Sequence, residues 1–190
     1  KLGAKGEEIL TGAGVSYCAT CDGAFFKGKT TAVIGGGDVA IEDAIFLARM
    51  CSKVYLIHRR DELRGAKSLQ NRLMSLDNVE VIWDTVVEEI VGSDKVEALK
   101  LNNKKTGEKS ELKVDGVFVA VGIEPDSGQY AGQVETDKQG YIIAGEDGRT
   151  SVDGVFAAGD VRTKALRQII TAAADGANCI TSAQSYLTRI

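Results

Sequence analysis

The sequence has 190 residues, of which 44% are hydrophobic and 26% are charged, so the chain can bury a core. Its formal net charge of −4 argues against nucleic-acid binding, which usually requires a basic face. No apolar run reaches the roughly 18 residues of a membrane span. The four cysteines include only one close pair, which favours a reducing cytoplasm over a secreted disulfide scaffold.

The first chemical signal follows residues 1–15, which have no clear period and are expected to be an incoming connection. It is the stretch Cys18-Ala19-Thr20-Cys21-Asp22. Two cysteines at this spacing can close and reopen a disulfide, and beside a βαβ pattern they indicate a redox dithiol. Asp22 has two interpretations, the cap of a turn or a proton shuttle for the thiolate that forms on reduction.

A zinc site is the alternative for the cysteine pair. Zinc usually requires four ligands, often from a second close pair. The other candidates are scattered single residues, Cys51, Cys179 and His58, so we predict no metal site. Cys51 and Cys179 are expected to be small buried residues in helices.

The next signal is a strand, a glycine loop and a helix. Residues 30–34 are β-branched or apolar and predict a buried parallel strand, and residues 38–50 have the apolar pattern of a helix packed on a sheet. Between them, Gly35-Gly36-Gly37-Asp38-Val39-Ala40 fits the dinucleotide-binding pattern G-x-G-x-x-G/A. Gly35 permits the tight turn, Gly37 lets the backbone approach the pyrophosphate, and Ala40 allows close packing.

The type of nucleotide is indicated at the end of the second strand, residues 53–58. An NAD site has an acid there for the ribose diol. This chain instead has Arg59 and Arg60, with Arg64 one turn later, and arginine offers a planar fork of donors that suits phosphate. The 2′-phosphate of NADPH is therefore favoured over a solvated basic turn. His58 either caps the strand or contacts the ligand.

The remaining pattern predicts two domains. A helix at 66–76 and strands at 79–83 and 117–121 complete a three-layer, parallel-sheet dinucleotide-binding domain, with an antiparallel meander at 86–91, 96–101 and 111–114. The only proline, Pro125, marks the boundary, so the domains are residues 1–124 and 125–190. In the second, strands are expected at 140–143 and 154–160 and a helix rich in small residues at 167–187.

Four motifs in this order resemble bacterial-type, low-molecular-weight thioredoxin reductases. They are SYCATCDG at 16–23, GGGDVA at 35–40, HRRD at 58–61 and GVFAAGDV at 154–161. The resemblance covers essentially the whole chain. It implies an NADPH-dependent FAD enzyme that reduces thioredoxin as a homodimer.

The resemblance also implies a role for each matching residue. Cys18 and Cys21 would form the redox-active disulfide, with Cys21 facing the flavin, Cys18 exchanging with thioredoxin, and Asp22 acting as general acid. The implied nucleotide and flavin contacts are Gly35, Gly36, Gly37, Asp38, Val39, Ala40, His58, Arg59, Arg60, Arg64, Gly122, Gly159, Asp160, Arg167, Gln168 and Ile169. The family has Ala where this chain has Ile169, a mild departure.

One departure from the family is larger. Its members begin with a further strand, G-x-G-x-x-G loop and helix for FAD, and this chain has one such loop only, beside the arginines. We therefore expect the chain to hold the NADPH domain and the C-terminal part of the FAD domain, and to be inactive by itself. Two alternatives stay open: the flavoprotein subunit of alkyl hydroperoxide reductase, and a catalytically inactive NADPH-binding module.

Overall fold

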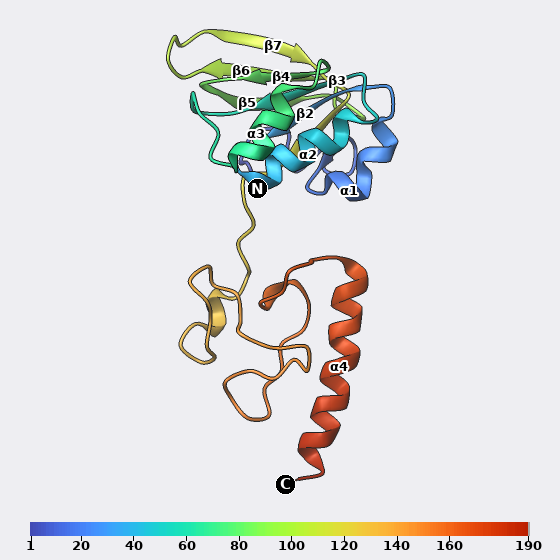
Figure 1. The fold of residues 1–190 in the computed structure, drawn as a ribbon, viewed down its shortest axis with the longest axis vertical. Coiled ribbons are helices and arrows are strands. Elements are labelled where there is room, and N and C mark those ends of the chain that lie inside the picture. Colours follow the sequence, from blue (N-terminus) through green and yellow to red (C-terminus); the bar gives the residue numbers. More distant parts are fainter. Residues whose placement is uncertain (190) are drawn as a thin grey trace. The chain divides into compact units, whose positions relative to one another are not determined.

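The computed structural model describes residues 1–189, which form two compact units, Lys1–Val121 and residues 122–189. The first unit is built on a five-stranded parallel sheet with the strand order β1-β8-β2-β3-β4 (Figure 1). Its strands are β1 (Val15–Ser16), β2 (Thr30–Ile34), β3 (Lys53–Ile57), β4 (Val79–Ile82) and β8 (Gly116–Val119).

Helices cover one face of this sheet. Helices α2 (Asp38–Ala48) and α3 (Lys67–Met74) lie on it, and α2 packs on side chains of β2, β3 and β8 such as Val33, Leu56 and Phe118. Burying each side chain of this size contributes roughly 1.5–3 kcal/mol. The short helices α1 (Ala19–Asp22) and η1 (Gly23–Phe26) join β1 to β2.

An antiparallel sheet covers the opposite face. Its strands are β5 (Thr85–Val91), β6 (Ala98–Asn103) and β7 (Lys109–Lys113), in that order. Ala32 and Ile34 point to this side because side chains alternate along β2, and they pack against Leu99 and Leu101 of β6. The expected α/β fold, with three layers and an antiparallel meander, is confirmed.

The second unit contains one long helix, α4 (Ile169–Leu187), and two turns of 3-10 helix, η2 (Gly128–Tyr130) and η3 (Gly159–Val161). The strands expected at 140–143 and 154–160 are wrong. In the described part of this unit, backbone pairing is limited to isolated bridges such as Thr136 with Ile142 and Arg149 with Phe156. An apolar run becomes a strand only when another strand pairs with its backbone.

Other differences are shifts of boundaries. The final helix begins at Ile169 rather than at residue 167, and β6 lies two residues later than expected. The Val96 amide, before the strand, donates to the Ala13 carbonyl at 2.9 Å. Cys51 is buried as expected, but it follows α2 instead of lying inside it. Cys179 lies in α4 and is half-buried.

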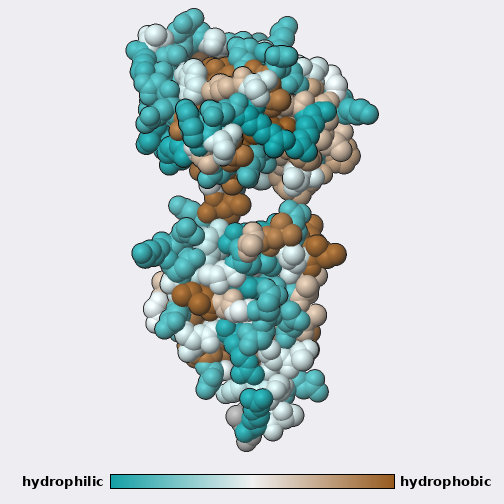
Figure 2. Space-filling view, viewed as in Figure 1, coloured by the Kyte–Doolittle hydropathy of each residue, from teal (hydrophilic) through white to brown (hydrophobic). Residues whose placement is uncertain are grey.

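Charged and apolar side chains are distributed unevenly over the surface. Figure 2 shows hydrophobic surface at the N-terminal end of α4, where Leu166, Ile169 and Ile170 are exposed. No helix of residues 1–189 has both the length and the apolar character needed to cross a bilayer.

Candidate active site

The dithiol lies in a one-turn helix that follows β1. Cys18 and Cys21 form a disulfide across helix α1, and the Cys18 sulfur also accepts a hydrogen bond from the Cys21 backbone amide, 3.2 Å away. Cys21 is exposed and Cys18 half-buried, so attacking groups can reach the bond. Cys51 and Cys179 are free thiols, and burial raises the pKa of both. The structure thus separates one accessible disulfide from two sheltered thiols.

Asp22 ends α1 and is held by a residue of the strand before it. The Ser16 hydroxyl donates to a carboxylate oxygen of Asp22 at 2.7 Å, and the same hydroxyl accepts from the Cys18 amide at 3.1 Å. Ser16 is buried at the end of β1, next to β8. One side chain thus joins the carboxylate to the backbone of the disulfide.

The glycine loop joins β2 to α2 and leaves no room for larger residues at two positions. A side chain at Gly35 would meet the Ala120 carbonyl, and one at Gly36 would meet the imidazole of His58. Gly37 has no atom within 4 Å of an added Cβ, so its backbone is open to a ligand. The residues present therefore fit a nucleotide backbone drawn close to the start of α2.

The loop also positions the arginine segment. The Arg64 amide donates to the Gly36 carbonyl at 2.7 Å, and the Asp38 carboxylate accepts from the Ala66 amide at 2.7 Å. Asp38 therefore holds the residue that precedes α3. Val39 is 61% exposed and points away from the core.

A cavity of about 420 Å³ opens beside this loop in the first unit. It brings together Gly35, Gly36, His58, Arg59 and Arg64, whereas Arg60 and Gly122 are not among its lining residues. Two of the three arginines expected at the glycine loop, Arg59 and Arg64, thus line one cavity with it, and Arg60 does not. The sequence pattern gave no sign of the other wall, which is formed by residues 85–87 at the start of β5 and by Lys1 and Leu2.

His58 lies in the cavity wall and is 4% exposed. Burial lowers its pKa, and the nearby Arg64 and Arg60 charges act in the same direction, so the imidazole is neutral at neutral pH. Its Nε2 atom is buried with no hydrogen-bond partner among the described residues. An orphaned polar atom of this kind fits a site that a polar ligand completes.

The residues expected to contact flavin lie in the second unit. Asp160 is exposed on η3, while Arg167 and Gln168 immediately precede α4. The Arg167 guanidinium stacks 3.9 Å above the ring of Tyr141, and its Nε atom is buried with no partner among residues 1–189. Gln168 forms a capping box with Thr171, whereas Ile169 is almost fully exposed. The structure thus brings Asp160, Arg167 and Gln168 to the segment that leads into α4.

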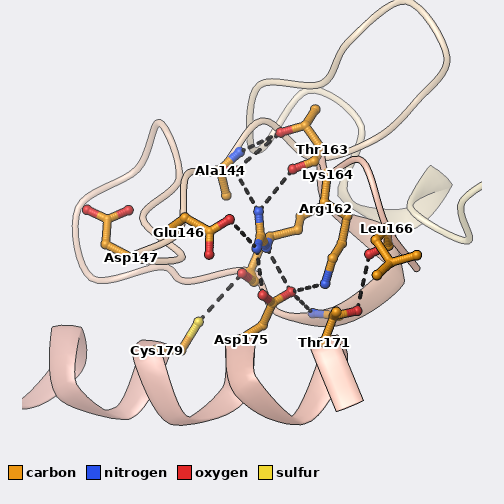
Figure 3. Close-up of polar contacts among 12 residues, drawn as sticks. Ala144, Glu146, Asp147, Arg162, Thr163, Lys164, Leu166, Thr171, Asp175 and Cys179 are labelled. Carbon is orange, nitrogen blue, oxygen red and sulfur yellow. Dashed lines mark hydrogen bonds and ion pairs between the residues drawn. The ribbon is translucent and has the colours of Figure 1, made fainter. Parts of the chain in front are cut away.

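A buried charge cluster holds this segment together (Figure 3). Asp175 of α4 accepts from Arg162 and Lys164, at 2.8 and 2.7 Å, and from the Gly159 amide at 2.9 Å. The side chains of Asp175, Arg162 and Lys164 are each at most 6% exposed. The hydrogen bonds from Arg162, then those from Lys164 and Gly159, hold the pKa of Asp175 far below its ordinary value. Asp175 thereby ties the loop that carries Asp160 to α4.

Within residues 1–189, no group of three or more His, Cys, Asp or Glu side chains is placed to hold a metal ion. Sequence reasoning missed Ser16 and Asp175, whose roles depend on contacts between distant elements.

Comparison with known proteins places these features in one family. Residues 1–176 match the family model described as pyridine nucleotide-disulphide oxidoreductase. The thioredoxin reductase of Listeria monocytogenes is 49% identical over 100% of this chain and 60% of its own length, and that of Bacillus subtilis is 46% identical over the same shares. The crystal structure of thioredoxin reductase from Streptococcus pyogenes is 48% identical, with a TM-score of 0.94 over 100% of this chain and 62% of that one.

The chain therefore spans about 60% of the length of these curated relatives. Because the family model matches residues 1–176, the chain belongs to the pyridine nucleotide-disulphide oxidoreductase family.

Proposed function

We propose that the chain is the dithiol- and NADPH-binding part of a thioredoxin-disulfide reductase, together with a segment of its FAD-binding domain. The observation that carries the proposal is that one unit holds both the Cys18–Cys21 disulfide and a glycine loop beside Arg59 and Arg64. The relatives named thioredoxin reductase support the choice of thioredoxin as partner. The proposal extends to a homodimer in a reducing cytoplasm.

Each cofactor has its own residues in this proposal. Arg59, Arg60 and Arg64 hold the 2′-phosphate of NADPH, and the backbone of residues 35–40 holds its pyrophosphate. Gly159, Asp160, Arg167, Gln168 and Ile169 hold the ribityl chain and ring of FAD. When bound, the two cofactors supply hydride and two-electron transfer. The chain's own contribution is to bind and orient them and to present the dithiol.

The dithiol then performs thiol–disulfide exchange. The Cys18 thiolate attacks one sulfur of the thioredoxin disulfide, and the electron pair of the broken bond leaves with the other sulfur. The Cys21 thiolate next attacks the Cys18 sulfur and releases the first thioredoxin sulfur. The disulfide of this chain is restored, and the two protons of its thiols end on thioredoxin. Asp22 is the proton carrier, because only the thiolate form of each cysteine reacts.

A single-turnover experiment tests this exchange without flavin. The chain is reduced with dithiothreitol, desalted, mixed with an oxidised bacterial thioredoxin, and quenched with an alkylating reagent. One thioredoxin disulfide should be reduced per chain. Cys18→Ser should abolish the reaction, and the matched control, Cys51→Ala, should leave it unchanged. Equal rates with oxidised glutathione and with thioredoxin would contradict the assignment of thioredoxin as the partner.

Nucleotide choice is tested by titrating NADPH and NADH. Each hydrogen bond to a charged phosphate contributes roughly 1.5–3 kcal/mol. Two such bonds predict at least about a hundredfold preference for NADPH. Comparable dissociation constants for the two nucleotides would show that the arginines are only a solvated turn. Arg64→Ala should remove most of the preference, whereas the exposed Arg72→Ala should not.

A further inference from the structure

The contacts of Ser16 exceed what a strand residue needs. Ser16 is the last residue of β1, the residue is 6% exposed, and its register partner in β8 is Phe118. It therefore has a fixed position in the parallel sheet. The chain that leaves it forms the one-turn helix with both redox cysteines.

The hydroxyl of Ser16 contacts both ends of this turn. It accepts from the Cys18 amide at 3.1 Å and lies 2.7 Å from the Asp22 carboxylate, against 3.4 Å from the Cys18 carbonyl. A hydroxyl has a single proton, and an acceptor oxygen at 2.7 Å binds it more strongly than one at 3.4 Å. The proton therefore points to Asp22, and the oxygen accepts from Cys18.

The position of Asp22 depends on this contact. Its backbone amide donates to the Cys18 carbonyl, so its main chain follows the turn of α1. Its side chain has rotamers that this backbone bond does not select. A hydrogen bond from a buried, sheet-anchored hydroxyl selects one of them, because breaking it would leave the buried donor with only the longer contact to the Cys18 carbonyl, at 3.4 Å.

We propose that Ser16 is a positioning residue for the dithiol centre: its hydroxyl holds the Asp22 carboxyl group in one orientation at the end of the turn that carries the Cys18–Cys21 disulfide, so that the thiolate released on reduction finds its proton carrier in place. The proposal rests on the role given to Asp22 in the proposed function. Strand β1, through Ser16, would then take part in the chemistry of the dithiol.

The step that tests it is reduction of the disulfide by dithiothreitol. A reagent thiolate attacks one cysteine sulfur, the S–S bond breaks, and the other cysteine leaves as a thiolate that takes up a proton. The second reagent thiol then resolves the mixed disulfide, so the reagent is oxidised and both cysteines end as thiols. This reaction requires neither thioredoxin, nor NADPH, nor flavin, and it can be followed in the present chain.

The rate constant is measured at neutral pH for wild type, Ser16→Ala, Asp22→Asn and the double variant. All four chains react with the same reagent at the same pH, so the ratios of their rate constants do not depend on the ionisation of dithiothreitol. We expect about a tenfold slower reduction for Ser16→Ala and at least as large a loss for Asp22→Asn. The double variant should be no slower than Asp22→Asn, because the two residues act as a unit. The control Ser75→Ala, which removes an exposed hydroxyl bonded to a carbonyl, should match wild type.

A second pair separates positioning from packing. Ser16→Thr keeps the hydroxyl and Ser16→Val replaces it with a methyl of similar volume, and both side chains suit a strand. Thr should restore most of the rate and Val should not. Equal rates for the two would overturn the proposal, even if Ser16→Ala failed to fold.

The outcomes also distinguish Ser16 from Asp22. Normal reduction by Ser16→Ala with slow reduction by Asp22→Asn would refute the role of Ser16 and leave the proposed function intact. A double variant whose loss of rate equals the product of the two single losses would refute the role of Ser16 as well. Normal reduction by Asp22→Asn would remove the proton-carrier role and the Ser16 proposal together. A chain that shows the expected pattern but does not reduce thioredoxin would support the Ser16 proposal while the proposed partner fails.

Discussion

Replacing Asp175 by Asn should unfold the second unit or bring it to the edge of unfolding. The substitution keeps the volume of the side chain but leaves Lys164 buried without a counter-charge and Arg162 with only the exposed Glu146, 3.6 Å away. It also turns an amide group toward positively charged donors. Breaking a buried pair in this way costs about 3–5 kcal/mol. A unit of the size of Gly122–Ile190 has a total stability of only roughly 3–10 kcal/mol at 0.05–0.15 kcal/mol per residue.

The two units can be followed separately. Trp83, the only tryptophan, lies in the first unit, so its fluorescence in a urea titration reports that unit alone. Hydrogen–deuterium exchange of peptides from α4 and from residues 157–164 reports the second. Asp175→Asn should abolish protection in those peptides and leave the Trp83 transition unchanged. The control is Asp153→Asn, an exposed site in the same unit. Protection within about 0.5 kcal/mol of wild type would refute the reasoning.

The same cluster predicts how the second unit responds to acid. The pKa of Asp175 is lower in the folded chain than its ordinary value of about 3.9. Its contribution to stability is therefore fully present above that value and is lost as the pH falls through the lower, folded pKa. The second unit should lose protection in this acid range, and the Asp175→Asn chain should not show this dependence. Glu146, which is exposed and 3.6 Å from Arg162, should contribute less than about 1 kcal/mol.

Three further predictions concern the first unit. Burial, and then the charge of its neighbour in α2, raises the pKa of Asp43 to about 6. Asp43→Asn should therefore stabilise the unit by ~1–2 kcal/mol at pH 8 and add nothing near pH 4. A urea titration that gave a larger gain in acid than in base would contradict this. Gly36→Ala should cost about 1–3 kcal/mol because the new methyl meets His58, whereas Gly37→Ala should unfold at nearly the wild-type urea concentration. Glu7 is buried and accepts from the backbone amides of Leu2 and Gly3, so Glu7→Gln should destabilise the unit by ~1–3 kcal/mol and lower the urea midpoint accordingly. An unchanged midpoint would show that these two hydrogen bonds do not stabilise the unit.

The parts of the fold that sequence patterns predicted are those encoded within short segments. The local composition of residues 30–48 is enough to predict a strand, a glycine turn and a helix, and the structure contains each of them. The run at 154–160 has similar apolar composition but forms no strand, because pairing depends on a second strand and not on the run itself. Val155 is in fact exposed.

The candidate site divides in the same way. Cys18 and Cys21 are recognisable by spacing, and Arg59 and Arg64 by their place after a strand. Asp175 cannot be recognised from the sequence, because a lone acid in a helix of small residues usually faces water. Its role becomes visible only in the structure, where the loop at residues 162–164 brings Arg162 and Lys164 to it. Ser16 is likewise an ordinary strand residue until the following turn folds back on it.

The order of strands in the first sheet has a consequence for synthesis of the protein. Strand β1 lies at the edge of the sheet beside β8, and Val15 is partnered by Val117. Closing a loop of this length carries an entropic cost, so such long-range pairings form slowly. A ribosome releases β8 about a hundred residues after β1, and chains emerge at roughly 5–20 residues per second. During that interval the cysteine turn has no strand to anchor it and no fixed Ser16. The cysteine turn thus lacks a fixed geometry for several seconds, and it gains that geometry only when the last strand of the unit inserts.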